Sequence, residues 1–481
     1  MRIASLYIRE LDAAVTSPPF VDELARFVAH TRFDDLPAVV VAKAKRHILD
    51  TFGAALAGAR SDEAKRTSVA LAAADGGGRS PAWGTSLAFS PRNAALVNGT
   101  AAHAFELDDT GGCDHSGAVV LPAAIAALDA TDRPLSGREL VTAVVLGYDL
   151  GRRVLEGFGG YKPHNQAGWH STGTCGTFAA AAAAASILGL DARALASALG
   201  LAASFSSGLW AFIHDGAMAK RVHAGRAAEG GLLAALLAAG GITGPMHVFD
   251  DVWGGFFKTF AATAPDPDAL TRDLGRTWAI SRAAIKPYAS CRDTHAAVDA
   301  VARVLDRHSL KAADVTEIRV RANAFLAGMV GGRVADSLPA AQMSLPYAVA
   351  ARTVFGSAGL SAYSATRRQD PVLRAMLDRV FLDIDETVVA SDRSTVKIAL
   401  SNGTEIEEST QIPRGAPENP LDDNDLFAKF AELAEPVLEA EPSQVLLTFT
   451  LALERMPDAR VLSELLRTTQ AASERRTDAR P

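Results

Sequence analysis

Apolar residues recur at helical spacing along most of the chain, from about residue 20 to about residue 275. Residues 33–59, FDDLPAVVVAKAKRHILDTFGAALAGA, have an apolar residue at every fourth position from Leu36 to Leu56, open with Asp-Leu-Pro and close at Gly58. Small residues line these segments, so helix axes can approach closely. The pattern predicts a helical bundle rather than alternating strands and helices. Further helix candidates, each set off by a short glycine or aspartate break, are AVVLPAAIAALDA, GRELVTAVVLGYDLGRRVLEGF, GTFAAAAAAASILGL, DARALASALGLAASF and EGGLLAALLAAGG.

The pattern changes to alternating polar and apolar positions after about residue 280. DVTEIRVRAN and STVKIALSNGTEIEEST have the spacing of strands, and Asn402-Gly403 inside the second is a strong hairpin signal. One helical segment, THAAVDAVARVLDRH, precedes both of them, and a second, SLPYAVAARTVFG, lies between them. These residues predict a small α+β domain over 285–411.

The helical pattern returns in PRGAPENPLDDNDLFAKFAELAEPVL, where Asp422 and Asp423 are cap candidates. We therefore expect a mainly α fold, a large all-helical domain with a smaller α+β domain inserted. Residues 1–284 would form the first part of the helical domain and 412–468 would complete it, followed by a disordered tail at 469–481.

Composition narrows the classes of function. The 481 residues are enough for two or more domains with a large core, and the net charge of −7 comes from interspersed signs, so no basic face for nucleic acid is expected. The N-terminal stretch has no signal-peptide core, and apolar runs such as FAAAAAAASILGL are shorter than the ~20 residues of a membrane span. A cytoplasmic protein with no membrane partner is predicted.

No motif for a metal or a cofactor stands out. Cys113, Cys175 and Cys291 cannot form a disulfide framework, and no Cys or His pair has the spacing of an iron–sulfur or zinc site. Dinucleotide and P-loop fingerprints are missing, and so is the G-x-S-x-G serine elbow. We expect neither a metal nor a cofactor.

The segment ELDDTGGCDHSGAVVLP, residues 106–122, concentrates acidic side chains, a thiol and a histidine directly before an apolar helix. One interpretation is a solvated loop ending in a helix N-cap, with Asp114 or Ser116 as the cap. The other is half of an active site. The segment alone leaves both open.

Other polar residues lie within small-residue segments of the helical part. His170 precedes a Ser/Thr/Gly-rich turn that opens an alanine helix, which fits either an anion site or a capping turn beside Trp169. Lys220 and His223 are three residues apart on one helical face. The lysine either extends to the surface or is held inside to meet a carboxylate.

The start of the α+β part offers a second group of candidates. Lys286, Cys291, Arg292 and His295 fall within sixteen residues, IKPYASCRDTHAAVDA. The arginine could bind a carboxylate through two hydrogen bonds, while the cysteine fits a small buried residue equally well. Tyr347 lies on an apolar helix, where core packing is the simpler interpretation.

Taken together, the ordered motifs resemble the MmgE/PrpD family, which includes 2-methylcitrate dehydratase, cis-aconitate decarboxylase and iminodisuccinate epimerase. The segments that carry the resemblance are KAKRHILDTFGAALAG, NGTAAHAFELDDT with HSGAVVLPAAIA, GWHSTGTCGTFAAAAAAASILGL, AKRVHAGRAAEGG, KPYASCRDTHAAVDA, SLPYAVA and RGAPENPLDDNDLFAKF. The resemblance implies a homodimer and cofactor-free chemistry on a small polycarboxylate in a cleft between domains. The pocket positions that it carries over are Glu106, Thr110, His115, His170, Lys220, Lys286 and Tyr347.

The sequence departs from the family pattern in three places. Glu106 stands where the decarboxylase type has Asp, and Cys291 falls where that type has a second lid histidine. The loop from Thr110 to His115 is one residue shorter, and DHSG replaces the more usual HPSG.

The expected function is that of a lyase, a dehydratase or a decarboxylase, that removes a proton α to a carboxylate. Histidine is the residue best suited to act as base near neutral pH, and cations must stabilise the developing negative charge. An epimerase would use the same residues, and a catalytically silent relative is the remaining alternative. The predicted catalytic residues are His115, His170, Lys220, Glu106 and Tyr347; the predicted substrate-binding residues are Thr110, Lys286, Arg292 and Cys291.

Overall fold

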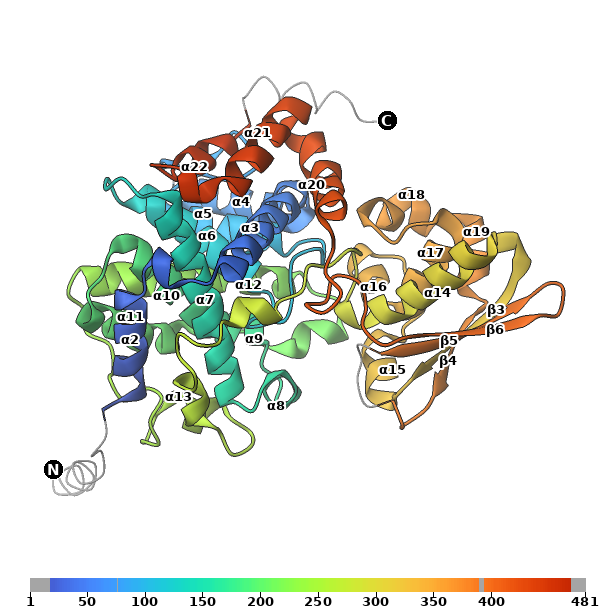
Figure 1. Ribbon diagram of the computed structural model, residues 1–481, viewed down its shortest axis with the longest axis horizontal. Helices are drawn as coiled ribbons and strands as arrows, with labels where there is room; N and C mark the ends of the chain where they lie inside the picture. Colours follow the sequence, from blue (N-terminus) through green and yellow to red (C-terminus); the bar gives the residue numbers. More distant parts are fainter. Residues whose placement is uncertain (1–17, 76, 389–392, 469–481) are drawn as a thin grey trace. The chain divides into compact units, whose positions relative to one another are not determined.

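The computed structural model describes residues 18–75, 77–388 and 393–468, which pack as two units (Figure 1). The larger unit comprises the described residues up to 104, residues 111–283, and those from 427 onward. The smaller unit comprises residues 105–110 and 284–426, and the insert predicted at 285–411 falls within it. The predicted tail, 469–481, lies outside the described residues.

The larger unit is built from helices around α10 (Gly176–Leu188), whose residues from Gly176 to Ala185 are all buried. The neighbours of α10 are α6 (Gly117–Ala130), α7 (Gly137–Gly157), α11 (Ala192–Phe205) and α12 (Ala219–Ala239). Alanine has almost no side chain to separate two helices, so these axes approach closely. The predicted bundle of small-residue helices is confirmed.

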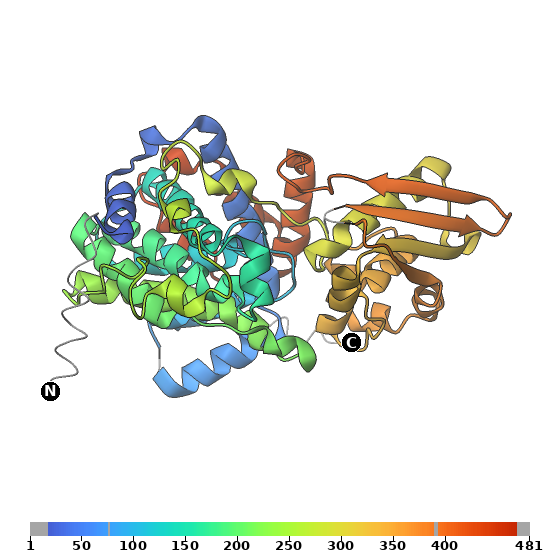
Figure 2. The same cartoon turned by 90° about the horizontal axis from the view of Figure 1, so that it is seen from below.

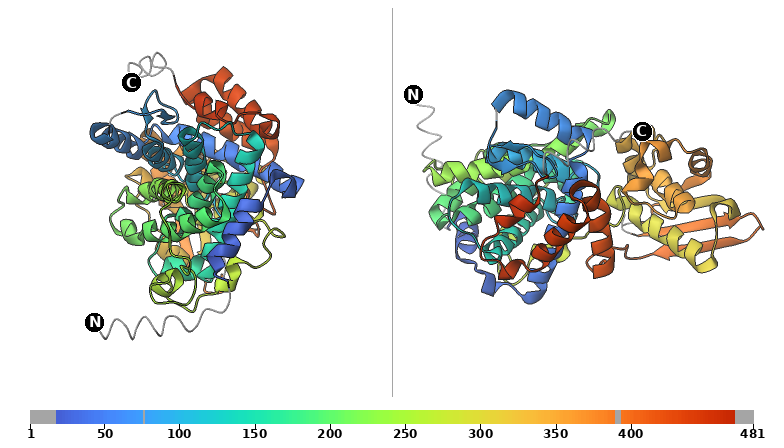
Figure 3. Two further views of the ribbon diagram at one scale, coloured as in Figure 1. Left: turned by 90° about the vertical axis from the view of Figure 1, so that its left-hand side faces the viewer. Right: turned by 90° about the horizontal axis from the view of Figure 1, so that it is seen from above.

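Other helices cover this core or lie at its edge. Figure 3 shows α4 at the periphery of the larger unit, in agreement with its mostly exposed side chains. Two short strands, β1 (Ser80–Pro81) and β2 (Ala88–Phe89), pair antiparallel. The further helices are α2 (Phe20–His30), α3 (Ala38–Gly58), α4 (Asp62–Asp75), α5 (Pro91–Ala102), α8 (Tyr161–Gln166), α9 (Ser171–Thr174), α13 (Phe256–Phe260), α20 (Asp423–Leu438), α21 (Ala440–Leu451) and α22 (Val461–Leu465).

Helix α3 shows how well local signals fix helix ends. It begins directly after Pro37 and ends at Gly58, as predicted. The packing against α5 also requires the glycine, because a Cβ at position 58 would lie 1.8 Å from the backbone oxygen of Ala101. Helix α20 likewise begins as predicted, with the Asp422 carboxylate accepting a 2.8 Å hydrogen bond from the amide of Asp425.

Residues 171–188 form a longer apolar helical stretch than the sequence suggested. Helices α9 and α10 together give 18 residues that are long and apolar enough to cross a membrane by composition alone. However, 89% of the stretch is buried inside the protein, as in the core helix of a soluble fold.

The smaller unit contains a four-stranded sheet of order β4-β3-β5-β6. Strands β5 (Ser394–Leu400) and β6 (Glu405–Thr410) pair antiparallel around the predicted Asn402-Gly403 turn, in which Gly403 has φ of 86°. Strand β3 (Val315–Ala322) pairs antiparallel with β5 and parallel with the edge strand β4 (Val380–Ile384). Strand β4 was not predicted; it is a short strand of which only Val380 is fully buried.

Helices pack on this sheet, as Figure 2 shows. Helix α14 (His295–His308) lies along β5 and β6, and α17 (Leu345–Phe355) packs between α14, α19 and β4. Both main helices match the predicted segments. The shorter helices of the unit are α15 (Ala324–Val330), α16 (Leu338–Gln342), α18 (Ala365–Arg368) and α19 (Pro371–Leu377).

Candidate active site

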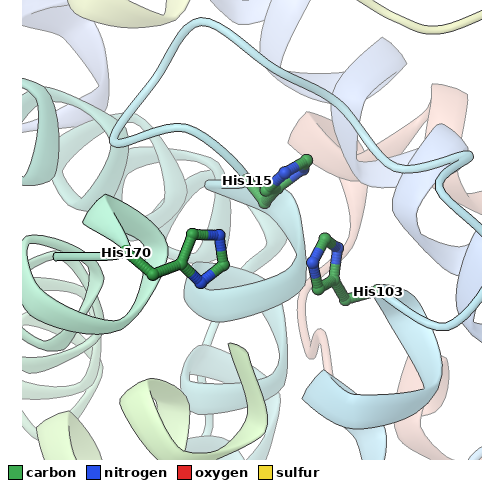
Figure 4. A group of neighbouring side chains, drawn as sticks. All are labelled: His103, His115 and His170. Carbon is green, nitrogen blue, oxygen red and sulfur yellow. The ribbon is translucent and has the colours of Figure 1, made fainter. Parts of the chain in front are cut away.

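Three buried histidines from three different elements converge in the larger unit (Figure 4). His103 ends α5, His115 lies just before α6, and His170 is the N-cap residue of α9. The ring centroids of His103 and His115 are 4.2 Å apart, and each is 6.2 Å from that of His170. Their exposed fractions are 0%, 5% and 0%. Imidazoles gathered this densely, away from water, form a candidate proton-transfer site.

Glycines in two crossing helices help to bring the group together. A Cβ on Gly99 of α5 would lie 2.7 Å from the Cα of Gly225 of α12, so neither position accepts a side chain at this separation. The crossing fixes α5, which ends at His103, against α12, which carries Lys220 and His223 near its start.

Residues next to His115 in the sequence hold the loop before α6 in place. The Ser116 hydroxyl accepts a 2.9 Å hydrogen bond from the amide of Cys113 and lies 3.2 Å from the Cys113 thiol. Ser116 is the N-cap residue of α6 but makes no capping hydrogen bond with its side chain. The prediction that the Ser116 side chain caps this helix is therefore wrong, because Ser116 ties the loop. The Asp114 carboxylate lies beside two of the histidines, and its capping of the helix stays a prediction.

Asp114 is the acidic member of the cluster. Its Oδ2 lies 3.5 Å from Nε2 of His115 and 3.8 Å from Nε2 of His170, and the residue is 8% exposed. The interpretation of this loop as solvated is wrong, because Glu106, Asp108, Asp109, Asp114 and His115 are all buried.

His170 is uncharged at neutral pH. Burial holds the pKa of its imidazole well below the usual range, and Lys220 lowers it further, followed by the other three histidines nearby. Its Nδ1 lies 3.1 Å from Nδ1 of His223. Burial and then Lys220 also lower the pKa of His223, to about 4. Both rings are therefore neutral groups that can accept a proton.

Lys220 is the cation of this site. It is 7% exposed and its Nζ lies 6.0 Å from the centroid of the Trp210 ring, so the surface interpretation of this lysine is wrong. Lys220 lies in the first turn of α12, which begins at Ala219, and it is one of the buried residues of this helix.

The histidine group can be tested for metal binding by its spacing. One ring nitrogen from each of the three histidines lies within 4.8 Å of the others. Two nitrogens on one zinc ion, each bound at about 2.1 Å, lie at most about 4.2 Å apart. Zinc binds carboxylate oxygen as well as imidazole nitrogen, and the Asp114 carboxylate lies beside two of these rings. The expected absence of a metal stays a prediction.

A second group of predicted residues lies in the smaller unit. Lys286 Nζ donates to Glu106 Oε2 at 3.2 Å, and both side chains are 1% exposed. Thr110 exchanges two backbone hydrogen bonds with Ala284, of 3.0 and 2.7 Å. The segment 105–110 is thereby fixed to the start of the 284–426 segment within this unit.

Arg292, Cys291 and Tyr347 each contact backbone oxygens of the smaller unit. Arg292 donates 2.9 Å to the backbone oxygen of Arg414 and lies 3.2 Å from Nδ1 of His295. The amide of Cys291 donates to the backbone oxygen of Gln342 at 2.9 Å. The Tyr347 hydroxyl donates 2.8 Å to the backbone oxygen of Ala362, and burial raises the pKa of this phenol to about 12. These contacts favour the packing interpretation of Tyr347.

The predicted site residues thus fall into two groups. The larger unit brings together His115, His170 and Lys220; the smaller unit holds Glu106, Thr110, Lys286, Cys291, Arg292 and Tyr347. His103 was not among the predicted residues, although it lies inside the motif NGTAAHAFELDDT at the end of a helix. His223 stood out in the sequence only for its spacing from Lys220.

Comparison with known proteins identifies the family. Residues 22–267 match the MmgE/PrpD N-terminal domain, and residues 288–455 match the MmgE/PrpD C-terminal domain. Together the two matches cover most of the chain.

Similar proteins match almost from end to end. The cis-aconitate decarboxylase-like protein oryM of Aspergillus oryzae is 28% identical over 473 residues, which cover 92% of this chain and 96% of that protein. Cis-aconitate decarboxylase of Aspergillus terreus is 29% identical over 471 residues, with 92% and 95% covered. The human cis-aconitate decarboxylase is 27% identical over 444 residues, with 89% and 90% covered. The chain is therefore a member of the MmgE/PrpD family and an enzyme of the lyase type.

Proposed function

We propose that this enzyme is a cofactor-independent lyase that acts on a small tricarboxylate or dicarboxylate, with decarboxylation of a cis-aconitate-like acid as the leading candidate. The observation that carries the proposal is the buried group of His103, His115 and His170, with Asp114 beside two of the rings. The names of the similar proteins favour decarboxylation over dehydration. Glu106, Thr110 and Lys286 are proposed to contribute to substrate binding.

Decarboxylation of cis-aconitate defines what the site must supply. The carboxylate on the saturated CH2 carbon leaves as CO2, and the electron pair of the broken bond forms a new double bond to the central carbon. The electrons of the old double bond move to the carbon next to another carboxylate, which then takes up a proton. A cation stabilises the charge that develops, and a histidine donates the proton. We assign the cation to Lys220 and the donor to His115.

Epimerisation is the second candidate, and it asks for a different first step. A neutral imidazole would remove the α-proton, and a proton would return to the opposite face without loss of a group. The neutral state of His170 suits a base of this kind. The same residues therefore support either reaction, and the fate of the proton separates them.

The test is a proton-NMR screen of di- and tricarboxylates with purified enzyme in deuterated buffer. Decarboxylation of cis-aconitate should produce a terminal CH2= signal and place one deuterium next to a carboxylate. Exchange of an α-proton without loss of a group would instead support the epimerase. Failure of every di- and tricarboxylate to react or exchange would contradict the proposed function.

Metal independence can be tested once a substrate turns over. Dialysis against a strong chelator should leave kcat and KM unchanged, because the proton donor and the stabilising cation are both protein side chains. The control is the same enzyme assayed after zinc or ferrous iron is added back. Activity that is lost on chelation and restored by either ion would overturn cofactor independence.

We further propose a cytoplasmic homodimer that contacts through the larger unit and binds neither nucleic acid nor membrane. The peripheral helix α4 supports this contact, since it exposes 70% of Val69 and buries only Ala64 and Ser68 fully. Sedimentation should give the mass of a dimer at micromolar concentration, and Val69→Glu should shift the equilibrium toward the monomer. A wild-type monomer at that concentration would contradict the proposal.

A further inference from the structure

Asp114 has an unusual backbone for a residue with a side chain. Its φ is 108°, whereas the other described non-glycine residues with positive φ lie between 51° and 75°, in or near the left-handed helical well. A backbone with φ near 108° suits glycine, which has no Cβ, and strains other residues. Glycine occupies positions 111 and 112 of this same loop. The carboxylate at position 114 is thus held at a conformational cost.

The strained backbone aims this carboxylate at two rings from different elements. Oδ2 of Asp114 lies 3.5 Å from Nε2 of His115 and 3.8 Å from Nε2 of His170. Nε2 of His170 makes no hydrogen bond within the described part of the chain. These distances exceed the usual length of a hydrogen bond by less than 1 Å, so a small movement of the carboxylate toward either ring would let that ring donate a hydrogen bond to it.

Several titratable groups face this carboxylate. The rings of His103, His115 and His170 and the ammonium of Lys220 interact within the cluster, and His223 contacts His170 from α12. Behind the loop, burial raises the pKa of the Cys175 thiol, the charge of Arg152 opposes this rise, and the charge of Asp114 adds a smaller contribution to it. The Arg152 guanidinium also contacts the loop, since its Nη1 donates to the backbone oxygen of Gly111 at 3.0 Å. The negative charge of Asp114, which lies nearest to the rings of His115 and His170, favours the protonated form of a neighbouring ring.

We propose that Asp114 is a positioning residue that stabilises the imidazolium form of His115, through its Nε2, and so keeps this ring ready as the proton donor. His170, which is fully buried and close to Lys220, stays neutral on the other side of the carboxylate. The catalytic use of the His115 proton rests on the proposed function. The pairing itself can be measured without any substrate.

The test combines histidine titration with two substitutions. In enzyme labelled at its histidines, the His115 signal, identified by its loss in His115→Gln, should titrate at a pH lower by about one unit or more in Asp114→Asn. An opposite charge within 4–6 Å typically shifts an imidazole by this amount. An unchanged His115 titration would overturn the inference, whether or not the enzyme proves to be a lyase.

Activity and stability supply the second readout. For Asp114→Asn, kcat should fall about tenfold or more at neutral pH with KM little changed, and the alkaline limb of the kcat profile should move to lower pH. Asp114→Gly should raise Tm by about 1–3 °C because the strain is relieved, yet lose activity as Asp114→Asn does. The matched control is Asp273→Gly, an exposed aspartate with φ of 55° in the same unit, which should leave kcat unchanged. A fully active Asp114→Gly, or a pH profile of Asp114→Asn that matches the wild type, would contradict the assignment.

Discussion

Replacement of His115 by alanine lowers kcat by roughly 10²–10⁴-fold with the fold intact, the usual effect of losing a general acid or base. The ring is 5% exposed and lies between His103 and the Asp114 carboxylate, so no water can readily replace it as a proton donor. Measurement of kcat and KM on the substrate found in the NMR screen tests this result. A thermal unfolding curve close to that of the wild type shows that the fold is kept.

Two controls separate proton transfer from packing. Added imidazole should restore part of the activity of His115→Ala, because a small acid can enter the space that the ring has left. His247→Gln is the matched variant, since His247 also lies beside an aspartate, with Nδ1 2.6 Å from Asp250 Oδ2, but outside the cluster. His247→Gln should retain full activity, and Cys291→Ser should lower kcat only slightly. If His115→Ala kept nearly normal activity while Cys291→Ser was inactive, the reacting group would be the Cys291 thiol of the smaller unit rather than His115.

Replacement of Lys220 by methionine should lower kcat/KM by about 10²–10³-fold, the range found when one charge-stabilising donor is removed. Lys220 is 7% exposed, and methionine keeps most of its volume while removing the charge. If the ammonium binds a substrate carboxylate and also stabilises the intermediate, KM rises and kcat falls together. Steady-state kinetics on the same substrate test both changes.

The same variant should change the pH dependence in a definite direction. Lys220 lowers the pKa of His170 and of His223, so both rings should bind protons at higher pH once it is gone. Loss of activity on acidification should therefore begin at a higher pH in Lys220→Met than in the wild type. Lys258→Met is the matched control, because Lys258 is half exposed and pairs with Asp251 on the surface of the same unit. An unchanged kcat/KM in Lys220→Met would remove this lysine from the mechanism.

Much of the fold could be predicted because its signals are local. Pro37 and Gly58 bound α3, Asp422 caps α20, and Asn402-Gly403 turns the β5–β6 hairpin, each through dihedral or hydrogen-bond preferences that act within a few residues. Small residues at helical spacing indicated the close-packed bundle for the same reason. Strand β4 was not predicted because an edge strand with one fully buried side chain shows little alternation of polar and apolar residues.

The candidate site could be predicted only in part. The family motifs pointed to His115, His170 and Lys220, which the larger unit does bring together. The sequence left Lys220 open between surface and interior, and it left the loop of Asp114 open between a capped, solvated loop and half of an active site. It did not single out His103 at all.

These outcomes depend on which helices cross, a property that no local pattern contains. Gly99 and Gly225 are far apart in the chain, yet their contact sets α5 against α12, and His103 and Lys220 follow from the ends of those helices. The orientation of Asp114 depends on a backbone with φ of 108°, which the surrounding packing imposes on one residue. The sequence by itself determined most of the core elements, the ends of α3 and of the β5–β6 hairpin, and the family resemblance. The tertiary structure decided which polar side chains are buried together, because burial and charge act between residues that only the packed chain makes neighbours.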